Sequence, residues 1–246
     1  MPLIRAHAVI LQAFPYSDTS KILRLYTPEL GLRSVIAKGA QRPKSRFGGI
    51  LEPFTEGEAH FFLKEGRDLH TLSGFDLIRS RQALGRDLTA FAAASLLAEL
   101  VIRTGTEEAQ PALFWVLLDA LERLASAPPL EIQLHAISSV WELIAQLGYH
   151  PELDVCVDCG RPFSEDEATR FDVEAGGTAC MVCRPTGRVV DPITRGEIRR
   201  MSSGEAGTGG VADPALQRAL IRVFVSTHLA HGSPLRSLSL YLEQLQ

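Results

Sequence analysis

Apolar residues in the first 80 positions fall into five short runs that lack the 3.6-residue period of a helix. The breaks between the runs carry turn-forming residues, such as Pro15 with Asp18 and Gly48 with Gly49. Five antiparallel strands without crossover helices are typical of a small closed barrel. We therefore expect an OB-fold, with an SH3-like barrel as the alternative, and strands at residues 4–11, 20–26, 32–37, 51–63 and 69–78.

From residue 82 the spacing of apolar residues changes to that of a helix, with Leu84, Leu88 and Phe91 on one face. Further along, Asp191-Pro192 and Asp213-Pro214 each place a capping Asp before a first-turn Pro. The chain is therefore predicted to be α+β and multidomain, with helices at about residues 82–103, 111–126, 130–147, 192–202 and 214–230.

These patterns divide the chain into four predicted parts. An OB-fold domain at residues 1–80 precedes a helical domain at 81–148, whose helices are expected to bury their apolar faces against each other. Residues 149–190 lose the helical period and carry every cysteine, and 191–246 are expected to add helices that pack with the helical domain. Residues 202–210 are rich in Gly and Ser, which favours a loop or linker.

The spacing of the cysteines is the sharpest chemical signal. Cys156 and Cys159 form one Cys-x2-Cys pair, and Cys180 and Cys183 form a second pair after a gap of 20 residues. Two such pairs are typical of a tetrahedral zinc site; two disulfides or four unrelated thiols are the alternatives. Because four thiolates leave no coordination position open, we expect one structural zinc ion. The arginines expected to offset its negative charge are Arg161, Arg184 and Arg188.

Charge is unevenly distributed along the chain. The net charge is -4, yet residues 1–80 carry +3 and residues 81–246 carry -7. A basic, Gly- and Pro-containing segment in the first part lets a backbone approach closely and suits phosphate groups, which favours DNA binding without sequence preference. A solvated charged loop is the alternative. The cations of this segment are Arg33, Lys38, Arg42, Lys44 and Arg46.

A second, smaller group of cations follows the cysteines. It consists of Arg195, Arg199 and Arg200 on the predicted helix at 192–202, where positions four apart share a face. We treat these three residues as further candidates for DNA contact, with an ordinary solvated helix face as the alternative.

Several function classes lack their motifs. No Gly-x4-Gly-Lys-Ser/Thr loop is present, and Gly207-x-Gly209 follows a linker rather than the strand that a dinucleotide fingerprint requires. His150-x-Glu152 precedes Cys156 by too few residues for a zinc deaminase. No apolar stretch reaches the ~20 residues of a membrane span, and the first residues do not form a secretion signal. We therefore expect a cytoplasmic protein that is not an enzyme.

The order of these features resembles the bacterial RecO family of DNA repair proteins. The resemblance rests on the run Ala37-Lys38-Gly39-Ala40-Gln41-Arg42-Pro43-Lys44-Ser45-Arg46 and on Leu147-Gly148-Tyr149-His150-Pro151-Glu152-Leu153-Asp154-x-Cys156. Ala8-Val9-Ile10-Leu11, Tyr26-Thr27-x3-Gly31 and Leu51-Glu52-Pro53-Phe54 also match the family pattern, and the match extends over about residues 3–235.

This resemblance implies an OB-fold, a helical domain and a zinc module in a recombination mediator that does not hydrolyse nucleotides. Such proteins bind single- and double-stranded DNA, anneal complementary strands, and act with RecR, and in some organisms RecF, to load RecA onto strands coated by single-stranded-DNA-binding protein at the nucleoid. Lys38 and Arg42 are the leading DNA contacts by this resemblance, and the four cysteines match the family's zinc ligands. The competing interpretation is a zinc-stapled adaptor that bridges proteins through its acidic helical half and does not bind DNA.

Overall fold

The computed structural model describes residues 2–64, 66–205, 210–230 and 233–243. The chain forms two compact units, each assembled from two segments of sequence. Met1–Asp87 and Ala98–Ser126 make up the N-terminal unit, whereas Leu88–Leu97 and Ala127–Gln246 make up the C-terminal unit.

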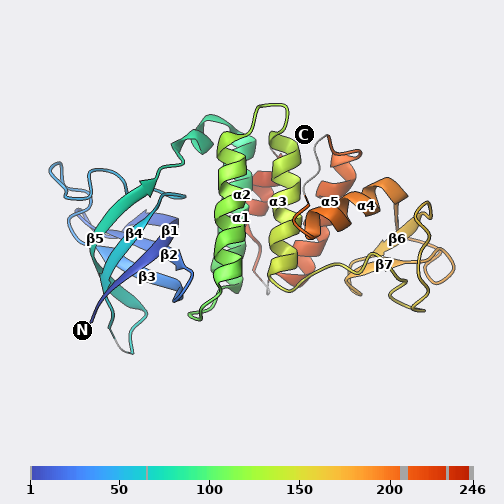
Figure 1. Ribbon diagram of the computed structural model, residues 1–246, viewed down its shortest axis with the longest axis horizontal. Helices are drawn as coiled ribbons and strands as arrows, with labels where there is room; N and C mark the ends of the chain where they lie inside the picture. The colour runs from blue at the N-terminus through green and yellow to red at the C-terminus, as the bar shows by residue number, and fades with distance from the viewer. Residues whose placement is uncertain (1, 65, 206–209, 231–232, 244–246) are drawn as a thin grey trace. The chain divides into compact units, whose positions relative to one another are not determined.

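A closed five-stranded barrel with the strand order β1-β2-β3-β5-β4 forms the larger part of the N-terminal unit (Figure 1). Neighbouring strands are antiparallel except for β3 and β5, which are parallel. This is the Greek-key arrangement of an OB-fold, so the predicted fold class is confirmed. The strands are β1 (Leu3–Pro15), β2 (Lys21–Thr27), β3 (Gly31–Ala37), β4 (Glu56–Phe62) and β5 (Leu69–Arg79).

Alternate residues of each strand point inward and fill the barrel with apolar side chains, among them Ile10, Leu25 and Phe61. The prediction of a strand at 51–63 was too long at its start. Phe54 has a positive φ of 68°, and its backbone N–H donates to the carbonyl of Ile10 over 2.7 Å. This turn, which begins beside Pro53, keeps residues 51–55 out of the sheet, and β4 begins only at Glu56.

The helical region begins differently from its prediction. The helix expected at 82–103 is divided into a 3-10 turn, η1 (Gln82–Arg86), and α1 (Leu88–Thr104), because Asp87 between them is extended, with φ -127° and ψ 123°. The helix α2 (Pro111–Ser126) matches its predicted range but belongs to the same unit as the barrel. The sequence-based division at 81–148 grouped it instead with the helix that follows.

Aromatic and polar contacts join α2 to the barrel. The ring of His7 on β1 lies 5.1 Å from that of Phe114 and 5.4 Å from that of Trp115. The hydroxyl of Tyr26 donates to the Gln110 side chain just before the helix, over 3.2 Å. Burial in this contact raises the pKa of Tyr26 to about 12. The barrel face around His7 and Tyr26 is therefore an internal surface of this unit.

A buried ion pair reinforces the same surface. The Arg81 side chain is 3% exposed and donates to the Glu56 carboxylate over 2.6 Å, to the Phe54 carbonyl over 3.2 Å and to Glu122 on α2 over 3.2 Å. Burial alone raises the pKa of Glu56, but hydrogen bonds from Arg81 and His7 outweigh it and hold that pKa below its usual value.

Replacement of Glu56 by Gln is expected to lower the free energy of unfolding at pH 7 by about 2–3 kcal/mol, because it leaves the buried Arg81 guanidinium without its closest carboxylate. The folded-state pKa of Glu56 is depressed, so its contribution is complete above the unfolded pKa of about 4.3 and is lost as the pH falls through the folded value. Urea unfolding of the wild-type and variant proteins at pH 7 and below pH 4 measures this difference in the free energy of unfolding. Glu52→Gln, which breaks the exposed pair with Lys21, is the control and should change stability by less than about 1 kcal/mol. Equal effects of the two substitutions would contradict the assignment.

In the described residues, the C-terminal unit contains four further helices and a small sheet with the order β7-β6-β8. Trp141 is fully buried on the first of these helices and donates from its indole N–H to Gln217 over 3.0 Å, and Gln217 in turn donates to Glu197 over 2.7 Å. This chain of hydrogen bonds ties three helices together. The elements are α3 (Ile132–Gln146), β6 (Thr169–Asp172), β7 (Gly177–Ala179), β8 (Arg188–Val190), α4 (Pro192–Ser202), α5 (Pro214–His228) and α6 (Arg236–Glu243).

Both Asp-Pro helix starts are confirmed, since the carboxylates of Asp191 and Asp213 accept the backbone N–H groups of Thr194 and Leu216. The helix α6 has no counterpart in the predictions, although its Tyr241 is fully buried. The predicted linker at 202–210 begins where α4 ends, and its residues 206–209, with the Gly207-x-Gly209 string, lie outside the described residues.

Candidate metal centre and nucleic-acid interface

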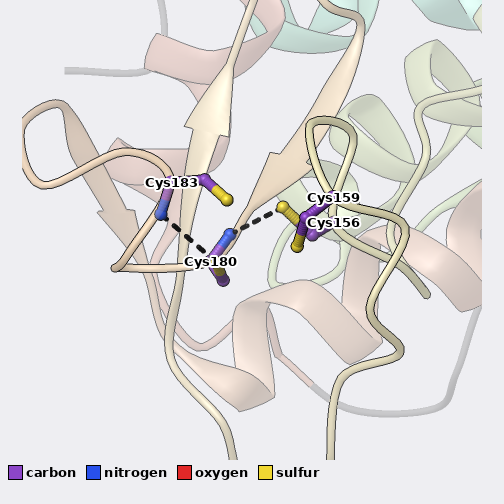
Figure 2. A group of neighbouring side chains, drawn as sticks. All are labelled: Cys156, Cys159, Cys180 and Cys183. Atoms are coloured by element: carbon purple, nitrogen blue, oxygen red, sulfur yellow. Dashed lines mark hydrogen bonds between the residues drawn. The ribbon is translucent and has the colours of Figure 1, made fainter.

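Two tight turns bring the four cysteines together. Cys156 and Cys159 lie in a turn closed by the N–H of Gly160 donating to the Cys156 carbonyl over 2.8 Å, and Gly160 takes the positive φ of 71° that the turn needs. Cys180 directly follows β7, and the N–H of Arg184 donates back to its carbonyl over 3.0 Å. Backbone pairing of Val157 with Thr178 over 3.0 Å brings the first turn beside β7. Figure 2 shows the two pairs facing each other.

The geometry of the four sulfurs fits a single metal ion. All four Sγ atoms lie within 4.8 Å of one another, and a tetrahedral zinc ion with Zn–S distances of about 2.3 Å holds its sulfurs about 3.8 Å apart. The N–H of Cys180 points at the Sγ of Cys156 over 3.3 Å, and the N–H of Cys183 points at the Sγ of Cys180 over 3.4 Å (Figure 2). Such N–H donors orient thiolates and partly neutralise them.

The acidities of the thiols also suit a cation. Burial raises the pKa of Cys156, but the N–H groups of Cys180, Cys159 and Asp158 outweigh it and lower that pKa to about 6. Hydrogen bonding from Cys183 lowers the pKa of Cys180. Conversely, the neighbouring thiols of Cys180 and Cys159 raise the pKa of Cys183 to about 12. Four sulfurs this close ionise together only around a positive ion, so the donor set fits a soft divalent metal.

The arginines near the cysteines are largely occupied by carboxylates. Arg184 pairs with Asp158 over 2.8 Å and with Asp172 over 3.1 Å, whereas Arg161 pairs with Glu167 over 3.0 Å. Glu167 and, less strongly, the Cys180 thiol raise the pKa of Arg161, and Asp158 and, less strongly, Cys183 raise the pKa of Arg184, so two of the three arginines expected to offset the charge of the site interact electrostatically with a cysteine. The Glu152 carboxylate accepts hydrogen bonds from the backbone N–H groups of Asp154 and Val155 and so takes part in a turn.

The basic segment forms a surface loop at residues 38–50, between β3 and the turn that precedes β4. Gln41 fixes one end, because its side-chain amide donates to the carbonyls of Ser17 over 2.8 Å and Ser20 over 2.9 Å. Phe47 fixes the other end, since it is buried in the barrel core. Neither anchor was predicted from the sequence, although an amide (Gln41) and an aromatic residue (Phe47) within a basic run indicate attachment to the fold.

Four cations of the segment project from this anchored loop. Lys38, Arg42, Lys44 and Arg46 are all exposed, and none of them pairs with a carboxylate within the described part of the chain. Arg46 additionally stacks on the Phe47 ring at 4.9 Å and donates to the Leu72 carbonyl over 3.4 Å. The structure therefore brings together four of the five predicted cations.

Arg33 must be removed from this group. Its side chain is 11% exposed and is held by the Glu107 carboxylate over 2.5 Å and by the Glu107 carbonyl over 3.1 Å. The sequence placed Arg33 in a run of cations, but its position on β3 turns it toward the loop that follows α1. Arg33 links β3 to the loop that follows α1, and its guanidinium is therefore not available to a phosphate.

Arg195 must be removed from the second group for the same reason. It is 2% exposed, donates to the carbonyls of Glu167 and Ser164 over 2.8 Å and 2.5 Å, and lies over the Phe163 ring at 5.1 Å. Arg199 is exposed but pairs with Asp154 over 2.5 Å, and Arg200 is exposed. The helical spacing was correct, but Arg195 faces the segment that carries the cysteines.

Together, the barrel with its basic loop and the helical unit with its four-cysteine cluster define an OB-fold protein with a candidate structural metal centre. Two family models match the sequence: one described as "Recombination protein O N terminal" over residues 1–81, and one described as "Recombination protein O C terminal" over residues 85–239.

Curated relatives agree with these family models. The chain is 33% identical over 241 residues to "DNA repair protein RecO" of Anaeromyxobacter sp. (strain K), covering 93% of this chain and 92% of the relative. It is 33% identical over 238 residues to the protein of the same name from Rubrobacter xylanophilus, covering 93% of each chain. The protein belongs to the RecO family, and this membership supports a role in DNA repair and recombination. Among the described residues, none of the helices has the length and apolar character of a membrane span.

Proposed function

We propose that this protein is a recombination mediator that binds single- and double-stranded DNA through the loop at 38–50 and anneals complementary strands without ATP. The observation that carries the proposal is a group of four exposed cations on an anchored loop of an OB barrel, none of which has a carboxylate partner among the described residues. Cations of this kind neutralise phosphates and release counterions, which gives affinity without sequence preference.

Annealing follows from holding backbones while leaving bases free. A loop that contacts phosphates leaves the Watson–Crick edges of a strand exposed. Two complementary strands held on one surface encounter each other at a high effective concentration, and pairing itself supplies the free energy. Such a protein requires neither a nucleotide nor a catalytic residue, so we propose that it is not an enzyme.

The remaining parts of the proposal come from the family. RecR, and in some organisms RecF, would act with this protein to load RecA onto strands coated by single-stranded-DNA-binding protein, in the cytoplasm at the nucleoid. We assign the metal as one zinc ion with a structural role, because four thiolates complete a tetrahedron and leave no position for a catalytic water. Arg199 and Arg200 remain secondary candidates for DNA contact.

The alternative function is a zinc-stapled adaptor that does not bind DNA. One observation favours it: Met181 and Val182, at the tip of the second cysteine turn, are 37% and 89% exposed. Exposed apolar residues on a rigid turn are suited to contact with a protein.

Fluorescence anisotropy with labelled single- and double-stranded DNA across a salt series distinguishes the two functions. If three or four loop cations contact phosphates, the logarithm of the association constant should fall with the logarithm of salt concentration with a slope of about -2 to -4. The same preparation should accelerate annealing of complementary strands in the absence of ATP. A protein that fails to bind either DNA at low salt would favour the adaptor.

A further inference from the structure

Three potential metal ligands, two from β4 and one from β5, converge on the outer face of the barrel. Glu58 and His60 are two residues apart on β4 and therefore point to the same side of the sheet. Asp76 on β5 stands directly opposite Glu58 in the antiparallel register. The His60 Nε2 lies 2.9 Å from the Glu58 Oε1 and 3.2 Å from the Asp76 Oδ2, and the three ligand atoms lie within 4.8 Å of one another.

This arrangement is costly without a positive charge at its centre. Carboxylates that face each other across two neighbouring strands repel and destabilise the pair. A single ring nitrogen, Nε2, approaches both of them, and a neutral imidazole can donate at most one proton there. A nitrogen and two carboxylate oxygens directed at one point are the arrangement found when a histidine and two acids share a metal ion.

The surroundings leave room for an ion. The residue opposite His60 on β5 is Gly74, which adds no side chain over the imidazole. His7 stands opposite Glu58 on β1, but its Nε2 contacts Glu56 over 2.9 Å instead. Arg5 stands opposite His60 on β1, so one protein cation lies on this side of the cluster. The Glu58 and Asp76 side chains are 47% and 75% exposed, so an ion can enter from solvent.

We propose that Glu58, His60 and Asp76 bind one divalent first-row transition-metal ion. The site shares no residue with the four-cysteine cluster. A mixed nitrogen and oxygen donor set suits zinc, manganese, iron or nickel better than magnesium, which favours oxygen ligands alone. The four thiolates of the cysteine cluster, by contrast, favour softer metal ions. Three protein ligands leave coordination positions for water or an anion. Because its ligands come from β4 and β5, the ion would link these two strands.

Isothermal titration calorimetry with Zn²⁺ tests the proposal on the full-length protein, after the cysteine cluster has been loaded with one equivalent. The wild-type protein is expected to bind a second equivalent. His60→Gln and Asp76→Asn are each expected to weaken that second event by about tenfold or more. Zinc should also raise the melting temperature of the loaded wild-type protein, and this rise should be lost in His60→Gln.

His135→Gln is the matched control, because His135 also lies beside a carboxylate, with its Nε2 3.6 Å from Glu131, but on a helix with one acid rather than two. It should retain the second equivalent. The proposal is overturned if the loaded wild-type protein binds no second equivalent, or if binding survives both His60→Gln and Asp76→Asn. Loss of binding in His135→Gln alone would place the second ion elsewhere and equally overturn it.

Discussion

Cys156→Ser is expected to abolish metal binding by the four-cysteine cluster and to unfold the segment between α3 and α4. Cys156 is 1% exposed and accepts the N–H of Cys180, so it lies at the centre of the cluster. The apolar cluster around the cysteines is small: Cys156, Ala179 and Cys180 are buried in it, with three partly buried neighbours. Binding of a structural zinc ion contributes roughly 10–16 kcal/mol in small zinc domains, far more than these contacts can supply.

Metal content by mass spectrometry and thermal unfolding by calorimetry measure this prediction. The variant should contain one equivalent of metal less than the wild-type protein and should lose the part of the unfolding transition that this segment contributes. All four cysteines belong to the cluster, so the control is chelation: stripping the wild-type protein should unfold the same segment, and stripping the variant should unfold no further segment. A variant with unchanged metal content and melting temperature would refute the structural role.

Reversing two loop charges, Lys38→Glu with Arg42→Glu, is expected to weaken DNA binding by about 10- to 100-fold at low salt and to make its salt dependence shallower by about two units of slope. Both side chains are exposed, so the fold should be unaffected. The effect should be similar for different DNA sequences, because phosphate contacts carry no sequence information. Anisotropy across a salt series measures both quantities.

The matched control is Arg86→Glu with Arg222→Glu, which changes the net charge by the same amount at exposed positions outside the loop. It should leave the slope close to that of the wild-type protein. If the two double variants weaken binding equally, overall charge rather than the loop governs affinity. If neither changes binding, the loop at 38–50 is not the DNA-binding surface.

The parts of the fold that local sequence encodes were predictable. The five strands, the two Asp-Pro helix starts and the paired cysteines all depend on residues within a few positions of one another. The short strands β6, β7 and β8 were not predictable, because three or four residues carry no readable period and depend on the cysteine turns for their position. The helix α6 spans only eight residues, about two turns, and was missed as well.

The site residues divide in the same way. Charge and spacing identified the cations of the loop, but nothing local to Arg33 or Arg195 indicates that Glu107 or the carbonyls of Ser164 and Glu167 lie against them. In the local sequence, an arginine that distant partners bury cannot be distinguished from an exposed arginine. The cluster of Glu58, His60 and Asp76 escaped notice because the register of β4 and β5, not sequence proximity, brings Asp76 to the other two residues.

The Arg81 ion pair bears on how this protein can be divided for study. A fragment that stops at residue 80 would retain Glu56, whose carboxylate is buried against Arg81, and Tyr26, whose hydroxyl relies on Gln110, while removing both partners. It would also uncover the face of β1 that packs on Phe114 and Trp115. The isolated barrel would thus expose an unpaired carboxylate and an apolar surface to solvent. A truncated protein that keeps these contacts has to include α2 and therefore extend at least to Ser126.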